Sequence, residues 1–188
     1  MKVLLLNGSP RKNGCTYTAL NVVADALKAE GIDAEVFQAG DPDMENVKAA
    51  AAKLKDSDAL VVGSPVYWAS PSGQIIEFMD RLASVAGKDM LYKPAAAVAS
   101  ARRAGTTATL DVLTKYFSYH QMPVVSSCYW NMVHGNTPEE VMKDEEGVQT
   151  MRILGRNMAW ILKSLNAAKE AGIEPPEREA KIKTNYIR

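Results

Sequence analysis

Short apolar or β-branched runs alternate along most of the chain with longer segments whose apolar residues recur at helical spacing. We expect strands at residues 2–7, 34–38, 58–64, 94–101 and 123–127. Parallel strands need a crossover helix between them, and such crossovers are right-handed. The pattern therefore predicts an α/β fold with a five-stranded parallel sheet and helices on both of its faces.

The composition excludes several classes of protein. The 188 residues suffice for one domain with its own core, and 22 Lys and Arg balance 22 Asp and Glu, so no overall charge favours nucleic acid or an anionic membrane. No stretch approaches the roughly 20 apolar residues of a membrane span, and the amino terminus lacks the apolar core of a signal peptide. Cys15 and Cys128 are too few for a disulfide framework or a four-thiolate metal site. We expect a cytoplasmic protein with no metal site.

We expect one domain over residues 1–171, followed by a polar tail over residues 172–188. Pro175 and Pro176 prevent the last helix from continuing into the tail. The tail has too few apolar residues for a core of its own. We therefore expect it to be extended or packed on a neighbouring subunit.

Three loops at one edge of the expected sheet have unusual sequences. They are "NGSPRKNGCT" at residues 7–16, "SPVYWASPSG" at 64–73 and "SARRAGTT" at 100–107. In open parallel sheets, ligands bind outside the carboxyl ends of the strands, and the loops after the first, third and fourth strands converge there. The first loop is basic, the second is aromatic and the third is rich in Gly and Arg. Together they predict a binding site for a phosphorylated, flat molecule with polar edges.

The first loop is longer than the connection of about two to six residues that an α/β unit needs. A helix amino terminus has unpaired N–H groups that bind anions, and Ser9, Arg11 and Thr16 can bind the remaining phosphate oxygens. The alternative is a long capped turn with solvated cations. Other anion loops do not fit, because Cys15 follows Gly14 where a Walker A loop needs Lys, and no Gly-x-Gly-x-x-Gly is present. A phosphatase loop places its Cys before its Arg, which reverses the order found here.

The chain resembles the flavodoxin-like NADPH-dependent FMN reductase family, and within it the iron-sulfur flavoprotein branch most of all. The matching residues are "GSPRKNGCT" at 8–16 and "GSPVYWASPSGQIIEFMDR" at 63–81, and the resemblance extends to roughly residue 165. It implies a flavodoxin-like three-layer sandwich whose five parallel strands have the order 2-1-3-4-5. The cluster-bearing cysteines of the branch are missing, since residues 38–57 contain none, so we expect no iron–sulfur centre.

The resemblance also implies a set of FMN-binding residues. For the phosphate these are Ser9, Arg11, Asn13, Gly14, Cys15 and Thr16. For the isoalloxazine ring and the ribityl chain they are Pro65, Val66, Tyr67 and Trp68. For the pyrimidine edge they are Ser100, Ala101, Arg102, Arg103 and Gly105. Packing in the core or an interface is the alternative for the two aromatic residues, and solvation is the alternative for the two arginines.

The function implied is that of an FMN-dependent oxidoreductase, which takes a hydride from NADH or NADPH at flavin N5 and passes electrons to a second acceptor. No side chain need act as acid or base, so we name no catalytic residue. A cation at the N1 and O2 edge would stabilise the reduced, anionic flavin, and Arg102 or Arg103 could supply it. The alternative is an FMN electron carrier of the flavodoxin type, although such carriers are usually strongly acidic and this chain is neutral. A third possibility is a regulatory flavin-binding module.

Residues 127–147 follow the fifth expected strand and carry Tyr129, Trp130 and Met132 to the same edge of the sheet. We expect a homodimer or homotetramer in which this loop or the tail helps to wall the flavin pocket of a neighbouring subunit. His134 lies in the same stretch, and a structural or subunit-contact role is preferred to a catalytic one.

Overall fold

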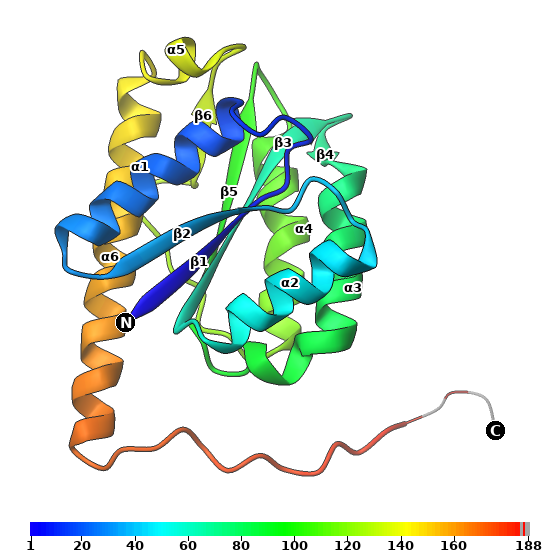
Figure 1. Cartoon of the computed structure of the whole chain (residues 1–188), viewed down its shortest axis with the longest axis vertical. Helices are drawn as coiled ribbons and strands as arrows, with labels where there is room; N and C mark the ends of the chain where they lie inside the picture. The colour runs from blue at the N-terminus through cyan, green and yellow to red at the C-terminus, as the bar shows by residue number, and fades with distance from the viewer. Residues whose placement is uncertain (185, 187–188) are drawn as a thin grey trace.

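The computed structural model describes residues 1–184 and 186, and it has a central sheet between two layers of helices (Figure 1). The strands are β1 (Lys2–Asn7), β2 (Asp33–Gln38), β3 (Ala59–Tyr67), β4 (Ser70–Pro71), β5 (Ala95–Ala101) and β6 (Met132–His134). The helices are α1 (Cys15–Ala29), α2 (Met44–Lys55), α3 (Gly73–Met90), α4 (Thr106–Tyr119), α5 (Pro138–Val141) and α6 (Glu145–Glu170). Strands and helices thus alternate along the chain, as the sequence predicts.

The sheet has the order β2-β1-β3-β5-β6, and each of these strands is parallel to its neighbours. The predicted fold class and the predicted order of the five parallel strands are confirmed. The short β4 is an addition, because it pairs antiparallel with the end of β3 and lies off the main path of the sheet. Because the strands are parallel, the loops after β1 and β3 lie at the same edge, and the change of winding direction between these strands opens a crevice between the loops.

The predicted position of the fifth strand is wrong. Within residues 123–127 only Val124 forms an isolated bridge, and the strand that pairs with β5 at this edge of the sheet is β6, several residues later. Between the two the chain leaves the sheet, and the side-chain amide of Asn131 donates a hydrogen bond to the Ala97 carbonyl oxygen at 3.1 Å. A side chain thereby satisfies the acceptor on β5 that a regular strand would have satisfied with its backbone.

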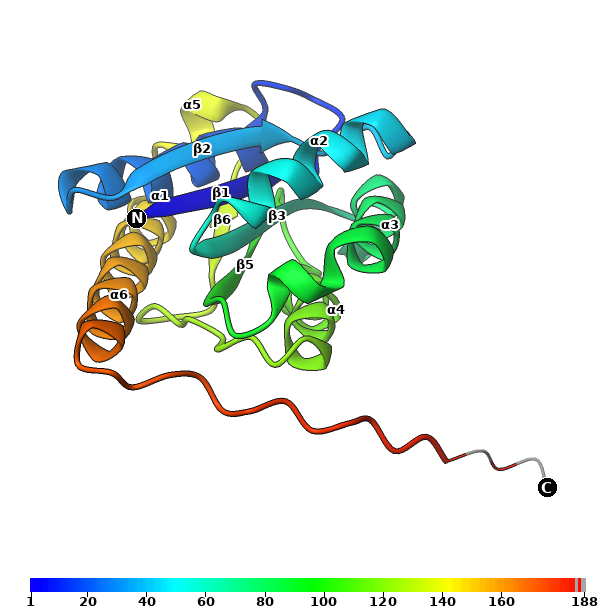
Figure 2. The same cartoon turned by 60° about the horizontal axis from the view of Figure 1, so that its bottom comes forward.

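Each face of the sheet has its own core. Val3 and Leu5 of β1 point into a cluster formed with α1 and α6, whereas Leu4 and Leu6 point into a cluster formed with α2, α3 and α4. All four side chains are fully buried, as the alternation of side chains along a strand between two helical layers requires. Figure 2 shows the two helical layers on opposite sides of the strands. This packing fixes the strand ends, and with them the edge that carries the loops.

The surface and the tail add little to the core. Helix α6 ends at Glu170, and Gly172 follows it with a φ of 80°, a left-handed conformation that suits glycine. From there to residue 184 the tail is exposed and forms neither helix nor strand. Residues 185 and 187–188 of the predicted tail lie outside the described residues.

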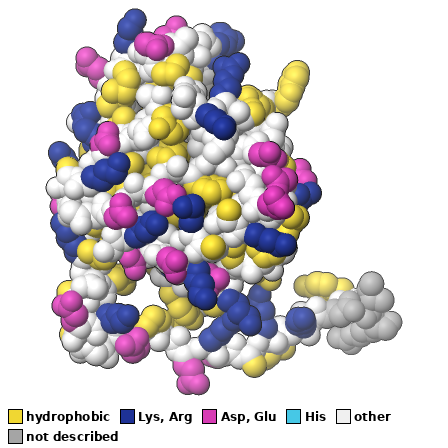
Figure 3. All heavy atoms as spheres, in the orientation of Figure 1, with side chains coloured by type: hydrophobic (Ala, Val, Ile, Leu, Met, Phe, Trp, Pro, Cys, Tyr) yellow, Lys and Arg dark blue, Asp and Glu magenta, His cyan; other side chains and the backbone are white. Residues whose placement is uncertain are grey.

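Figure 3 shows Lys and Arg side chains interspersed with Asp and Glu over one face. No helix in the described part of the chain is long and apolar enough to cross a membrane.

Candidate functional site

The three unusual loops converge at the carboxyl edge of the sheet, where they surround a cavity of about 190 Å³. Its walls are formed by Ser9, Arg11, Cys15, Thr16, Pro65, Val66, Tyr67, Ser100, Ala101, Arg102, Gly135 and Asn136. Most of these residues belong to the predicted site. The remaining predicted residues, which do not line this cavity, are Asn13, Gly14, Trp68, Arg103 and Gly105.

The first loop is organised by Asn7, the last residue of β1, whose side chain is fully buried. Its amide nitrogen donates to the Gln38 side chain at 2.7 Å and to the carbonyl oxygens of Arg11 and Lys12, both at 3.3 Å. Its amide oxygen accepts a hydrogen bond from the backbone N–H of Ser9 at 3.2 Å. One side chain therefore holds both the start and the middle of the loop, a role that the sequence analysis missed.

A second set of contacts fixes the loop at Ser9. The Ser9 hydroxyl accepts a hydrogen bond from the backbone N–H of Arg11 at 3.1 Å, and the Gln38 side chain donates to the Ser9 carbonyl oxygen at 2.6 Å. The backbone at Gly40 also passes very close to this loop, since an added Cβ on Gly40 would lie 2.1 Å from the Ser9 carbonyl oxygen. Any larger residue at position 40 would displace the loop.

Helix α1 begins directly at this loop and has no side-chain cap. Gly14 is its N-cap, its first turn contains no acidic residue, and its first backbone hydrogen bond runs from Thr18 N–H to the Gly14 carbonyl. Side chains cap three other helices, namely Asp43 in α2, Ser72 in α3 and Asp144 in α6, whereas α4 also begins at a glycine without a side-chain cap. The uncapped end leaves backbone N–H groups and a partial positive charge available to an anion at the cavity.

Two buried hydroxyls join the first and third loops at the wall of the cavity. Thr16 Oγ1 lies 2.7 Å from Ser100 Oγ, and both side chains are buried. Because a hydroxyl pair uses only one of its two hydrogens in the mutual bond, one O–H remains to donate to a ligand. The pair therefore links β5 to α1 and can also bind an anion.

The structure separates the two arginines of the third loop. Arg102 lines the cavity together with Arg11, so two arginines border it, although the chain has no net charge. Arg103 does not line the cavity, and its carbonyl oxygen lies 3.0 Å from Nε2 of His134. Of the two arginines, only Arg102 lines the cavity.

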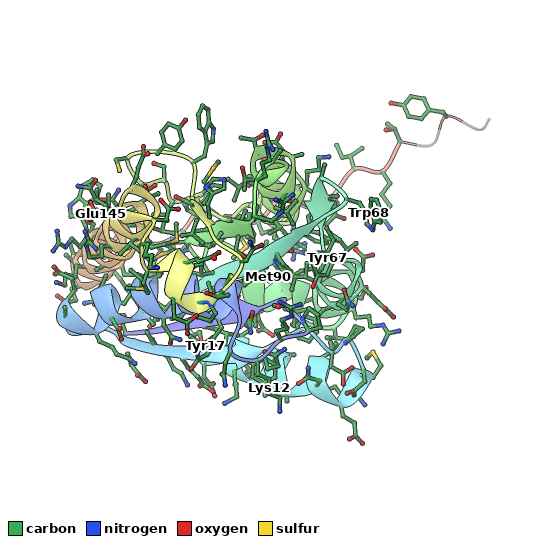
Figure 4. The ribbon with its side chains drawn as sticks, turned by 90° about the horizontal axis from the view of Figure 1, so that it is seen from above. Lys12, Tyr17, Tyr67, Trp68, Met90 and Glu145 are labelled. Atoms are coloured by element: carbon green, nitrogen blue, oxygen red, sulfur yellow. The ribbon has the colours of Figure 1, made fainter. Side chains whose placement is uncertain are left out.

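The second loop is a hairpin in which β3 turns back through β4. Its residues Pro65, Val66 and Tyr67 line the cavity. Trp68 follows at the turn, outside the cavity wall, and is 99% exposed. Figure 4 shows Trp68 at the outer tip of the hairpin, with Tyr67 nearer the middle of the molecule. The two neighbouring aromatic residues thus have different surroundings.

The fourth wall of the cavity was not predicted. It consists of Gly135 and Asn136, which directly follow β6. The Gly135 N–H donates to the Ala101 carbonyl at 3.1 Å, and the Cys15 thiol donates to the Gly135 carbonyl at 3.5 Å. The incorrect placement of the edge strand hid this wall. The sequence did contain a signal for a strand that ends in a turn, since "MVHGN" at residues 132–136 begins with two apolar residues and ends with Gly-Asn.

His134 connects this wall to the rest of the protein. Its backbone N–H donates to the Asp144 carboxylate at 2.7 Å, and its ring contacts the Arg103 carbonyl as described above. The side chain does not line the cavity. These contacts give His134 a part in holding the third loop against the start of α6.

Comparison with solved structures defines the class of the protein. A flavodoxin from the domain Archaea superposes with a TM-score of 0.67 at 18% sequence identity, covering 87% of this chain and 99% of that chain. The protein is therefore a flavodoxin-like α/β protein.

The family follows from the sequence comparisons. The family model described as NADPH-dependent FMN reductase matches residues 1–137, and the chain belongs to this family. An iron-sulfur flavoprotein of Methanocaldococcus jannaschii is 29% identical over 189 residues, which cover 87% of this chain and 98% of that protein. An NADPH azoreductase of Bacillus sp. is 30% identical over 108 residues, which cover 54% of this chain and 59% of that enzyme. The chain is thus a flavoprotein of the oxidoreductase type.

The position of Cys15 leads to a test by chemical labelling. Burial raises the pKa of the Cys15 thiol above its ordinary value, and the thiol hydrogen is engaged by Gly135. Because the thiolate is the reactive form, iodoacetamide at pH 8 should label exposed Cys128 well before Cys15. Peptide mass mapping over time measures both rates, and urea-unfolded protein provides the control, in which the two rates should converge. Faster labelling of Cys15 in the folded protein would contradict this account of the loop.

Proposed function

We propose that the protein is an FMN-dependent NAD(P)H oxidoreductase of the flavin or quinone reductase kind, which passes electrons from NADPH or NADH to a small-molecule acceptor. The observation that carries this proposal is the uncapped start of α1 beside Arg11, at one end of a cavity whose side wall contains Tyr67. An anion site joined to an aromatic wall suits a phosphorylated, planar cofactor.

The residues present offer a partner for the phosphate, for the ring and for the pyrimidine edge of FMN. The first loop and the start of α1 would bind the phosphate, with Ser9 and Thr16 supplying hydroxyls. Residues 65–67 would lie along the ring and the ribityl chain, and Arg102 would lie at the pyrimidine edge. When bound, FMN accepts a hydride from a reduced nicotinamide and returns two electrons to a second molecule.

The chain's own residues would then act by binding and by electrostatics. Arg102 would stabilise the negative charge that accumulates at the pyrimidine edge on reduction. The loops would hold the flavin so that the remaining face meets the nicotinamide and the acceptor in turn. No residue is assigned to proton transfer, because flavin, quinone, nitroaromatic and metal-ion acceptors place different demands on protons.

The size of the cavity supports an oligomer. Pockets that enclose a ligand the size of a drug usually measure about 300 to 1,000 Å³, whereas this cavity measures about 190 Å³ and so would enclose only part of FMN. We propose that residues 127–147 or the tail of a neighbouring subunit supply the missing wall in a homodimer or homotetramer. Tyr129 and Trp130, which contact each other edge to face and are both exposed, favour residues 127–147.

The decisive experiment is anaerobic reduction of the purified, FMN-loaded protein by each nicotinamide. We expect NADPH or NADH alone to bleach the flavin absorbance, and an added quinone to restore it. Free FMN at the same concentration is the control for the uncatalysed reaction. A protein that stays oxidised with both nicotinamides, yet accepts electrons from dithionite, would be an electron carrier of the flavodoxin type instead.

The two arginines of the third loop provide a matched pair of variants. Arg102→Gln should lower the two-electron potential of bound FMN, because the anionic reduced form loses a nearby cation. At this solvent-exposed edge we expect about 1 to 2 kcal/mol, or roughly 20 to 45 mV. Arg103→Gln should shift the potential by less than half as much, since Arg103 does not line the cavity.

Equilibrium titration against redox dyes measures both potentials once FMN occupancy has been checked. Equal shifts in the two variants would assign the effect to general charge rather than to position. An unchanged potential in fully loaded Arg102→Gln would remove the tuning role altogether, and binding of the nicotinamide phosphate would then become the better assignment for this arginine.

A further inference from the structure

The part of the third loop that carries the two arginines is fixed at both ends. At one end, the Ala101 carbonyl oxygen accepts a hydrogen bond from the Gly135 N–H at 3.1 Å. At the other end, Gly105 packs so closely under the β3–β4 hairpin that an added Cβ would lie 2.6 Å from Ala69 Cα. Residues 102–104 between these ends are all exposed. A short exposed segment of this kind opens easily unless a contact holds it.

One side chain supplies such a contact. Nε2 of His134 lies 3.0 Å from the Arg103 carbonyl oxygen, and the structure gives residues 102–104 no other hydrogen bond among the described residues. Because a carbonyl oxygen can only accept, Nε2 of His134 carries the hydrogen and donates it. The segment is thus held at its middle residue, directly after Arg102 of the cavity wall.

His134 is itself held between the sheet and α6. It pairs in register with Ala101 of β5, which places it next to the start of the segment. Its backbone N–H donates to one carboxylate oxygen of Asp144 at 2.7 Å, and its Nδ1 lies 3.8 Å from the same oxygen. Asp144 also caps α6, since its other oxygen accepts a hydrogen bond from the Gly147 N–H at 3.0 Å. The ring therefore connects the third loop to a fixed point of the fold.

We propose that His134 is a positioning residue of the flavin site, whose hydrogen bond to Arg103 keeps residues 102–104 in the conformation that puts Arg102 at the cavity. An exposed arginine loses backbone and side-chain freedom when it is fixed at a ligand, and holding its backbone in advance lowers that cost. The inference rests on the proposed function in one respect, because the effect on bound FMN is expected through Arg102.

A catalytic role for this histidine fits the contacts less well. Its ring does not line the cavity, and its two nitrogens face groups of the protein, namely the Arg103 carbonyl and the Asp144 carboxylate. A proton donor would need a nitrogen within hydrogen-bond reach of the reacting molecule. The remaining alternative is a purely structural role, in which the ring stabilises the fold without acting on Arg102.

The first test measures the loop directly, in the apoprotein. Trypsin cleaves after Arg102 and Arg103, at a rate that follows the population of the opened loop. In His134→Ala we expect these two cleavages to be about twofold to fivefold faster, the lower part of the range for one hydrogen bond, because the ring is 43% exposed. His134→Gln, whose amide can donate to the same carbonyl oxygen, should be cleaved like the parent. Cleavage after Arg178 in the exposed tail is the internal reference.

His120→Ala is the matched control. It removes the other histidine and a ring contact with a carbonyl oxygen, that of Tyr116 at 2.7 Å, at the opposite end of α4 from the cavity. Cleavage of the third loop should stay at the parent rate in this variant. A general loss of stability would also speed cleavage after Arg81 within α3, and urea unfolding of each variant measures that loss separately.

The second test asks whether the histidine acts through Arg102. The potential of bound FMN is measured by dye titration in four fully loaded proteins, namely the parent, His134→Ala, Arg102→Gln and the double variant. We expect His134→Ala to lower the potential in the parent and to leave it unchanged where Arg102 is already replaced, because residues that act together are not additive. A structural role, or a charge on the histidine itself, predicts the same shift in both backgrounds.

The proposal is overturned if His134→Ala leaves either the cleavage of the third loop or the potential at the parent value, if cleavage rises equally within α3, or if the two shifts in potential are additive. Failure of both nicotinamides to reduce the protein would remove the proposed function but leave both tests in place, since the dyes equilibrate with the flavin directly. A chain that takes up no FMN would also remove the proposed function, and the cleavage rates would then decide the role of His134.

Discussion

The interaction on which the proposed site depends is the attraction between an anion and the uncapped amino terminus of α1. The chain has no net charge, so a phosphate would have to be attracted by local groups, and in our proposal these are the backbone N–H groups of an uncapped helix and Arg11. Capping by a side chain, as at α2 and α3, would stabilise the helix but compete with the ligand. Binding and helix capping thus use the same groups, and a bound phosphate would act as the cap.

The loop before this helix is held in its conformation by hydrogen bonds to residues at the ends of β1 and β2. Asn7 holds it through hydrogen bonds at its start and middle, Gln38 adds a link from β2, and Gly40 leaves room for the close approach of the chain. These contacts come from the ends of neighbouring strands, whose positions the two cores fix. The Thr16–Ser100 pair extends the same support to the third loop, so the order of the strands determines which groups meet at the cavity.

The sequence predicted those parts of the fold that depend on periodic burial. The strands β1, β2, β3 and β5 and their helices follow from apolar spacing, whereas the last parallel strand was misplaced. Beside it, the side chain of Asn131 takes the place of a backbone partner, and such a contact leaves no trace in periodicity. Asn7 was overlooked because Asn is common in turns, so an Asn at the end of a strand gives no sign of a special role. Trp68 was grouped with Tyr67 because the two are adjacent in sequence, but the positive φ of the turn directs the two side chains to different surroundings. Patterns of residues therefore located the loops, and the backbone conformation within each loop had to come from the structure.

The most direct measurement of the central claim is the affinity of the apoprotein for FMN in two neighbouring charge variants. Arg11 and Lys12 are both exposed, but only Arg11 lines the cavity, and Arg11→Gln and Lys12→Gln change the net charge equally at adjacent positions. If the first loop binds the phosphate, Arg11→Gln should weaken FMN binding about tenfold to a hundredfold, the effect of losing one charge-assisted hydrogen bond, and Lys12→Gln should change it far less. Equal dissociation constants in the two variants, or an unchanged one in Arg11→Gln, would show that the phosphate is not held there.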